Sequence, residues 1–172
     1  MKWIKFRLSL GWLVTGCMCG VVIAGCGNSA VPSKQTIPSE VVMTEKALPE
    51  NFYERTENGL LVEKAVVEDE FAALWSDFGF KAERPEWTEG TNVMLFIGTI
   101  ESGSCPLTFA GAESDNVEGE MIVHLDIRSD NPCTNDATPR AFVLAVEEEE
   151  LNGITSVKIQ AKGSGNPSVT LP

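Results

Sequence analysis

The sequence predicts an α+β domain that is mainly β: a small antiparallel sheet or sandwich-like domain with one amphipathic helix packed on it near its N-terminus. Two observations lead to this fold class. Short runs that are apolar, or that alternate apolar and polar residues, recur between residues 92 and 161, which is typical of β-strands. Residues 68–78 alone show the three- and four-residue spacing of a helix. Strands that follow a helix without regular alternation favour an α+β fold.

The N-terminal segment has the layout of a bacterial secretory signal. Lys2, Lys5 and Arg7 precede the mostly apolar residues 8–24, as in signal peptides. The run Val22-Ile23-Ala24-Gly25-Cys26 resembles a lipobox, with Ile in place of the commoner Leu. This resemblance implies a signal peptide over residues 1–25, its removal, and lipidation of the Cys26 sulfur. An uncleaved transmembrane helix and a plain secreted protein with a free Cys26 thiol are the alternatives.

A lipidated chain would be attached to the membrane without spanning it. Two acyl chains at Cys26 are sufficient for stable attachment, whereas one is marginal. Cleavage leaves 147 residues, enough for one domain, and loss of three basic residues changes the net charge from −12 to about −15. We therefore expect a protein at the extracytoplasmic side of the cell membrane that does not bind nucleic acid.

The cysteines predict one disulfide. Cys17 and Cys19 leave with the signal peptide and Cys26 receives lipid, so Cys105 and Cys133 remain. Exported proteins meet an oxidising environment in which an even number of cysteines usually forms disulfides. A metal or redox site at this pair is the alternative, although the spacing differs from C-x-x-C.

Composition divides the mature chain into three parts. Residues 26–48, rich in Ser, Pro, Thr and Lys, predict a lipidated flexible tether. Residues 49–161 hold the periodic segments and form the single domain. Residues 162–172, which contain Gly163, Gly165 and Pro167, predict a loose C-terminal tail.

The first half of the domain contains a predicted hairpin and the predicted helix. Residues 52–67 are interrupted by Asn58-Gly59, a dipeptide that suits a tight type I′ turn, although a longer or shifted connection is also consistent with the sequence. The helix at 68–78 places its apolar residues on one face and begins with three carboxylates, which its dipole favours. Gly79 is placed to end it. The apolar residues of that face are Phe71, Leu74, Trp75 and Phe78.

The second half predicts strands. Residues 92–100 and 141–146 are apolar on both faces, as in central strands, whereas 119–128 alternates and has one polar face. Asn152-Gly153 predicts a hairpin between 141–146 and 154–161, with Val146 opposite Ile159 and Glu147 opposite Lys158. In that register the acidic run 147–150 is the exposed end of a hairpin rather than a cation site.

The polar face of 119–128 is the candidate binding face, with His124, Asp126 and Arg128. His124 and Asp126 would also serve a catalytic triad with Ser102 or Ser104, but no G-x-S-x-G motif accompanies these serines. The sequence shows no catalytic constellation, so we do not expect an enzyme.

Oxygen ligands for calcium are dense in the loop region after this strand, but they lack EF-hand spacing and also suit turns. These residues are Asp126, Asp130, Asn131, Asn135 and Asp136. We therefore predict neither a metal nor a cofactor.

Two segments carry a resemblance to a known family. Val93-Met94-Leu95-Phe96-Ile97-Gly98-Thr99 with Ser102-Gly103-Ser104-Cys105-Pro106, and the segment 133–144, are distantly similar to the C-terminal domain of the PrcB family, named for an accessory subunit of a surface protease complex. The similarity covers about residues 66–160. This chain has Gly-Ser-Cys-Pro and Thr-Pro-Arg-Ala-Phe where that family tends to have Gly-Gly-Tyr and Thr-Pro-Tyr. The resemblance therefore implies the fold, and it transfers no functional residue.

Together these observations predict a lipid-anchored cell-envelope protein that works as a protein-interaction module, as an accessory or inhibitor of a surface protease or of another envelope complex. A lipoprotein that binds a small ligand or cation on the face around His124 is the alternative. An enzyme that depends on His124 is the third hypothesis.

Overall fold

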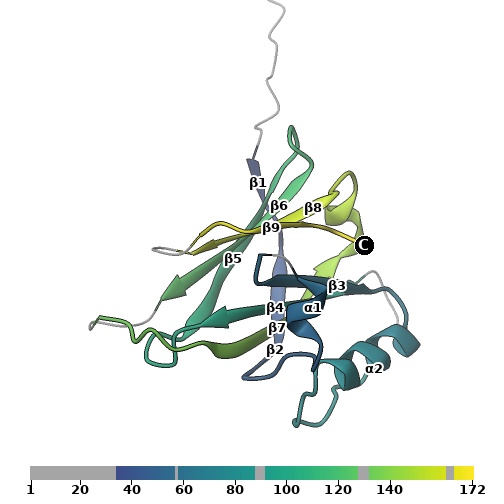
Figure 1. Cartoon of the computed structure of the whole chain (residues 1–172). Coiled ribbons are helices and arrows are strands. Elements are labelled where there is room, and N and C mark those ends of the chain that lie inside the picture. The colour runs from purple at the N-terminus through teal and green to yellow at the C-terminus, as the bar shows by residue number, and fades with distance from the viewer. Residues whose placement is uncertain (1–33, 57, 88–91, 128–131, 162–164) are drawn as a thin grey trace, which may run out of the picture. The chain divides into compact units, whose positions relative to one another are not determined.

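The computed structural model describes residues 34–56, 58–87, 92–127, 132–161 and 165–172 (Figure 1). The predicted signal peptide, Cys26 and Arg128 lie outside these ranges. Within them, no helix combines the length and the apolar character that crossing a membrane requires.

The described chain is a mainly β α+β domain, as the sequence predicts. It forms nine strands, two α-helices and one 3₁₀ helix. In chain order these are β1 (Lys34–Thr36), β2 (Ser39–Glu45), α1 (Phe52–Arg55), β3 (Leu60–Ala65), α2 (Glu68–Asp77), β4 (Asn92–Glu101), β5 (Leu107–Asp115), β6 (Glu120–Ile127), β7 (Thr138–Glu147), η1 (Glu148–Leu151), β8 (Ser156–Ala161) and β9 (Ser168–Thr170).

The strands form two sheets that pack face to face. One sheet has the order β1-β5-β6-β8-β9 and the other the order β2-β7-β4-β3. All neighbours pair antiparallel except β6 and β8, which are parallel. Alternate residues of β4 and β7 meet those of β6 and β8 in an apolar core between the sheets, so the domain is a β-sandwich.

A second core covers the other face of the four-stranded sheet, where α1 and α2 lie (Figure 1). Phe71 and Phe78 of the α2 region are fully buried against Phe96 of β4, with ring centroids 5.8 and 5.3 Å apart. The helix therefore packs on a sheet, as its periodicity predicts. Gly79 follows it with a φ of +71°, a left-handed conformation that ends helices.

Strands β4 and β7 are the two inner strands of the four-stranded sheet, and residues on both of their faces are buried. Val93, Leu95 and Ile97 point into the sandwich, whereas Met94 and Phe96 point toward the helices. This agrees with the continuous apolar runs from which both strands are predicted. In β6, Met121, Val123 and Leu125 are buried as predicted, but Ile122 on the other face is buried as well.

The prediction of a flexible tether is wrong for residues 34–45, which form β1 and β2. Strand β1 is an exposed edge strand held by pairing with β5, and Ile37 between the two strands is 2 % exposed in the sandwich core. Edge strands need few apolar residues, because backbone hydrogen bonds hold them. The sequence of β1 is polar, and the apolar run Val41-Val42-Met43 of β2 contains a register shift between Val41 and Met43, which hides its alternation.

The predicted hairpin around Asn58-Gly59 does not form. Residues 52–55 are α1, and only β3 follows the turn. The Thr56 hydroxyl contacts both backbone groups of Leu60, accepting from its N–H at 3.0 Å and donating to its carbonyl at 2.8 Å. Glu63, in β3, pairs with Arg55 of α1 at 2.7 Å.

The predicted hairpin around Asn152-Gly153 is also wrong. Strands β7 and β8 belong to different sheets, and β8 pairs in parallel with β6. Lys158 bonds Glu120 at 3.2 Å rather than Glu147. Gly153 has the positive φ that a turn needs, at +81°, but a chain that crosses between sheets needs such a residue as much as a hairpin does. The acidic residues 147–149 are exposed, and most of the run forms η1.

Two further segments differ from expectation. Residues 168–170 of the predicted tail form β9 on the edge of the five-stranded sheet. Residues 107–115, for which we predict no strand, form β5. A register shift between Phe109 and Gly111 breaks the alternation of β5, which explains why its period is hidden.

Candidate functional site

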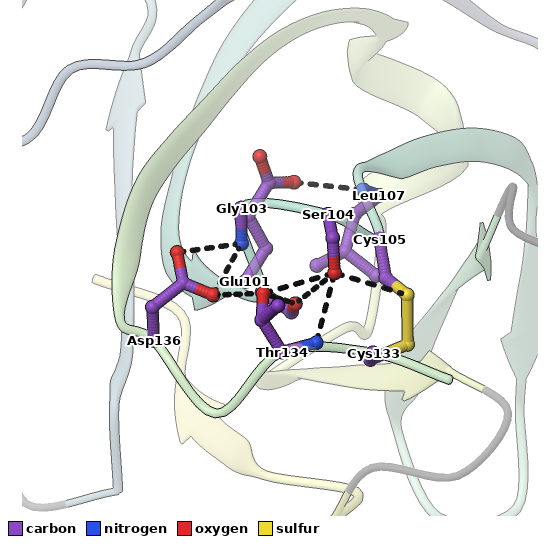
Figure 2. The surroundings of a disulfide bond; sticks show 9 residues. Glu101, Gly103, Ser104, Cys105, Leu107, Cys133, Thr134 and Asp136 are labelled. Atoms are coloured by element: carbon purple, nitrogen blue, oxygen red, sulfur yellow. Dashed lines mark hydrogen bonds between the residues drawn. A yellow bond between two sulfur atoms is a disulfide. The ribbon is translucent and has the colours of Figure 1, made fainter. Parts of the chain in front are cut away.

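One end of the sandwich holds the best candidate site, where three kinds of bond tie two loops together (Figure 2). The first loop is the turn 102–105 between β4 and β5, and the second is the described segment 132–137 before β7. Because β4 and β7 are neighbouring central strands, both loops stand on the most buried part of the fold. A rigid scaffold of this kind commonly presents recognition loops.

The disulfide between Cys105 and Cys133 is the first tie. Its Cα atoms are 5.4 Å apart, within the usual range for such bonds. Cys105 is buried and Cys133 is exposed, so the bond connects the sandwich core to the outer loop. The structure thus shows the predicted pairing.

Hydroxyl groups make the second tie. The Thr134 hydroxyl lies 3.0 Å from that of Ser102 and 2.9 Å from that of Ser104, and the Thr134 N–H donates to Ser104 Oγ at 2.8 Å. The turn closes on itself through the Cys105 N–H, which donates to the Ser102 carbonyl at 3.1 Å. These serines therefore serve the loop contact.

Asp136 makes the third tie. Its two carboxylate oxygens accept the Gly103 N–H at 3.1 and 3.0 Å, and they also accept the hydroxyls of Thr134 and Thr138. These hydrogen bonds, the one from Thr134 first, lower the pKa of Asp136 below its ordinary value of 3.8. We call these hydrogen bonds of Asp136 to Gly103, Thr134 and Thr138 the loop clasp. A side chain at position 103 would collide with the Asp136 carboxylate, so the loop clasp requires Gly103.

A buried ion pair lies beneath these loops. Glu101, at the end of β4, points into the sandwich, and its side chain is 0 % exposed. Both of its oxygens accept hydrogen bonds from the Arg140 guanidinium of β7, and Oε2 also accepts the Leu107 N–H at 2.7 Å. A bidentate pair of this kind is strong and directional, and it fixes where β5 starts relative to β4.

The bonded loops border a recess of about 560 Å³ that opens at this end of the sandwich. Its walls include Leu107, Ile127 and Ile159 of the five-stranded sheet and Thr99 and Glu101 of β4, while Asn135 and Asp136 stand at its rim. Its volume lies within the range of roughly 300–1,000 Å³ that is typical of ligand pockets. Apolar walls with a few fixed polar groups are also typical of binding sites.

The predicted binding face on β6 lies elsewhere, on the outer side of the five-stranded sheet. His124 Nε2 lies 3.4 Å from Glu113 Oε1, which also accepts Lys34 Nζ at 2.7 Å. The bond from Lys34 contributes most to lowering the pKa of Glu113. Asp126 is exposed, and Arg128 lies outside the described residues. A binding role for this face stays a prediction.

The serine triad does not assemble in the described part of the chain. Ser102 and Ser104 share their hydrogen bonds with Thr134, whereas His124 is paired with Glu113. Among the same residues no group of three His, Cys, Asp or Glu side chains is placed to hold a metal. Of the five residues considered for calcium, Asp130 and Asn131 lie outside the described ranges.

Sequence reasoning missed the Glu101–Arg140 pair and the recess. The available signal was a charged residue at the end of an otherwise apolar strand, in each of two central strands. Comparison of the chain with protein-family models, with curated proteins and with solved structures finds no match.

Proposed function

We propose that this protein is a lipid-anchored protein of the cell envelope whose sandwich domain binds another protein through the loops 102–105 and 132–137. The observation that carries the proposal is the threefold connection of these loops beside a recess. Loops that are already ordered lose little conformational freedom on binding, which favours affinity. In this proposal the domain acts as a binding module and not as an enzyme.

The anchor is the part of the proposal that concerns location. We propose cleavage before Cys26 and attachment of acyl chains to its sulfur, supported by the lipobox-like run 22–26. Mass spectrometry of the mature chain should find an N-terminal Cys26 carrying lipid. Cys26→Ser should abolish the lipid mass, whereas Cys19→Ser, within the segment to be removed, should not. An unmodified Cys26 thiol or a retained N-terminal segment would refute the anchor.

The partner class follows from location and from the resemblance to the PrcB family. An accessory or inhibitory role toward a surface protease, or toward another envelope complex, is the proposed setting. Photocrosslinking in intact cells tests this proposal independently of the partner's identity. A photoreactive residue at Asn135, on the exposed rim, should give a defined crosslinked protein.

The same residue at Ala73 is the matched control, because Ala73 is exposed on α2, which packs on the four-stranded sheet away from the five-stranded one. It should give no such adduct. The absence of an adduct at Asn135, or the same adducts at both positions, would contradict a role for the bonded loops in binding.

A further inference from the structure

The recess has a chemical character that indicates what enters it. Its described lining residues include two carboxylates, of Glu101 and Asp136, and no lysine, arginine or histidine. The rest of the lining is apolar or carries neutral amides and hydroxyls. The two carboxylates differ, because Arg140 neutralises Glu101, whereas the described residues that donate hydrogen bonds to Asp136 are all neutral.

Asp136 therefore remains a negative charge at the rim of an apolar recess. None of the ion pairs among the described residues includes it. The whole chain is acidic as well, with a formal net charge of −12, and such a field attracts cationic partners and repels anionic ones.

An apolar wall next to a fixed negative charge matches one type of side chain particularly well. Lysine and arginine carry a cation on an aliphatic stem, which they bury while the charged end stays at a polar border. The recess offers the stem the walls formed by Leu107, Ile127 and Ile159, and it offers the cation Asp136 and the neighbouring hydroxyl and amide groups.

We propose that the recess receives a lysine or arginine side chain carried on a short segment of the partner protein. This inference rests on the proposed function, and it adds the chemistry of the partner. The volume of about 560 Å³ exceeds one side chain, so the neighbouring residues of the segment also enter its mouth.

A peptide-binding assay with the full mature chain in phosphatidylcholine nanodiscs tests the inference. The probes are five fluorescent heptapeptide mixtures that are identical except for a fixed central Arg, Lys, norleucine, Gln or Glu. Mixtures with central Arg or Lys should bind about fivefold or more tightly than those with norleucine or Gln, and Glu should bind most weakly. The preference should fall as salt rises.

Two pairs of variants locate the binding. Ala137→Trp fills the recess from its exposed rim, whereas Ala73→Trp adds the same volume on α2. Asn135→Lys adds a competing cation at the rim, whereas Gln160→Lys adds one on the exposed outer face of β8. All four positions are exposed, so the fold should tolerate each change. Binding should fall at least fivefold in the first member of each pair and less than twofold in the second.

Two outcomes would overturn the inference. Equal binding of the norleucine and Arg mixtures would show that the recess does not recognise a cation. An equal loss of binding in both members of a pair would place the binding elsewhere. Neither outcome affects the crosslinking at Asn135, so the partner chemistry can fail while the proposed function stands. The absence of the Asn135 adduct would remove both.

Discussion

Glu101 and Arg140 are a pair of charged residues inside a β-sandwich, where charge is costly unless it is matched. The Glu101 side chain is 0 % exposed and that of Arg140 is 11 % exposed. The pair contributes directional bonds: the bidentate contact and the hydrogen bond from the Leu107 N–H fix β4, β5 and β7 relative to one another beside the recess. Either residue alone would be an unpaired buried charge, which is energetically costly.

Removal of Arg140 should therefore be strongly destabilising. Arg140→Met leaves an unpaired buried carboxylate and should lower the free energy of unfolding by about 3–5 kcal/mol, as measured by urea denaturation. The double variant Glu101→Gln with Arg140→Met removes that charge while keeping an acceptor for Leu107, so it should be more stable than the single variant. A double variant that is the less stable of the two would contradict the role of the uncompensated charge.

Asp136 makes the loop clasp sensitive to acid. Its pKa in the folded protein lies below the ordinary 3.8, because Thr134, Gly103 and Thr138 donate hydrogen bonds to the charged form. A depressed pKa contributes stability that is present above the ordinary value and is lost as the pH falls through the folded value. The clasp should therefore weaken as the pH falls below 3.8.

Thermal melting between about pH 6 and about pH 2 measures this effect. Asp136→Asn should lose less melting temperature across that range than the wild type does. Asp126→Asn is the control, because Asp126 is exposed on β6 and its side chain makes no hydrogen bond with described residues. Equal acid sensitivity of the wild type and Asp136→Asn would exclude the clasp as a source.

Among the elements, β4 has one position, Gly98, where there is no room for a side chain. A Cβ atom at Gly98 would lie 2.6 Å from Leu48 Cδ2 and 3.3 Å from Phe78 Cε1. The segment that carries Leu48 and the end of α2 thus pack directly on the bare backbone of β4. The helix layer depends on this close approach.

Gly98→Ala should accordingly destabilise the protein by about 1–3 kcal/mol, the usual cost of overpacking a core. Gly165→Ala is the matched control, because an added methyl there meets no atom within 4 Å. Urea denaturation of both variants measures the difference. A Gly98→Ala variant as stable as the control would show that Leu48 moves aside at no cost.

For the molecule as a whole, the disulfide and the loop clasp act on the same end of the sandwich. The two cysteines are separated by 28 residues in sequence, and the chain between them contains β5 and β6. Closing a loop of that length restricts the unfolded chain, and the chain-entropy model assigns it roughly 3.5 kcal/mol. Much of the net stability of a domain of this size therefore depends on one bond.

The double variant Cys105→Ser with Cys133→Ser should lower the free energy of unfolding by about this amount in urea denaturation. The pair Cys17→Ser and Cys19→Ser, in the predicted signal peptide, should leave the stability of the mature chain unchanged. A negligible loss in the first variant would show that the disulfide restricts the unfolded chain less than the chain-entropy model assumes.

Local pattern was sufficient wherever a segment's own neighbours decide its structure. The mainly β class, the helix ending before Gly79 and the two central strands follow from the spacing of apolar residues, because burial imposes the period of each element. The cysteine pairing followed from counting. The predicted lipidation at Cys26 and the partner class remain expectations from sequence and resemblance.

The spacing of apolar residues did not reveal which strands pair with one another. Gly59 and Gly153 have positive φ in connections that join α1 to β3 and one sheet to the other, yet each resembled a hairpin in sequence, because both connections need the same backbone freedom. Likewise β1 is held by pairing with the distant β5, whereas β5 and β9 pair with their sequence neighbours β6 and β8 without a clear period of their own. Glu101 and Arg140, 39 residues apart, meet only once the two central strands have paired. The recess they underlie exists only in the folded chain, because its walls come from both sheets.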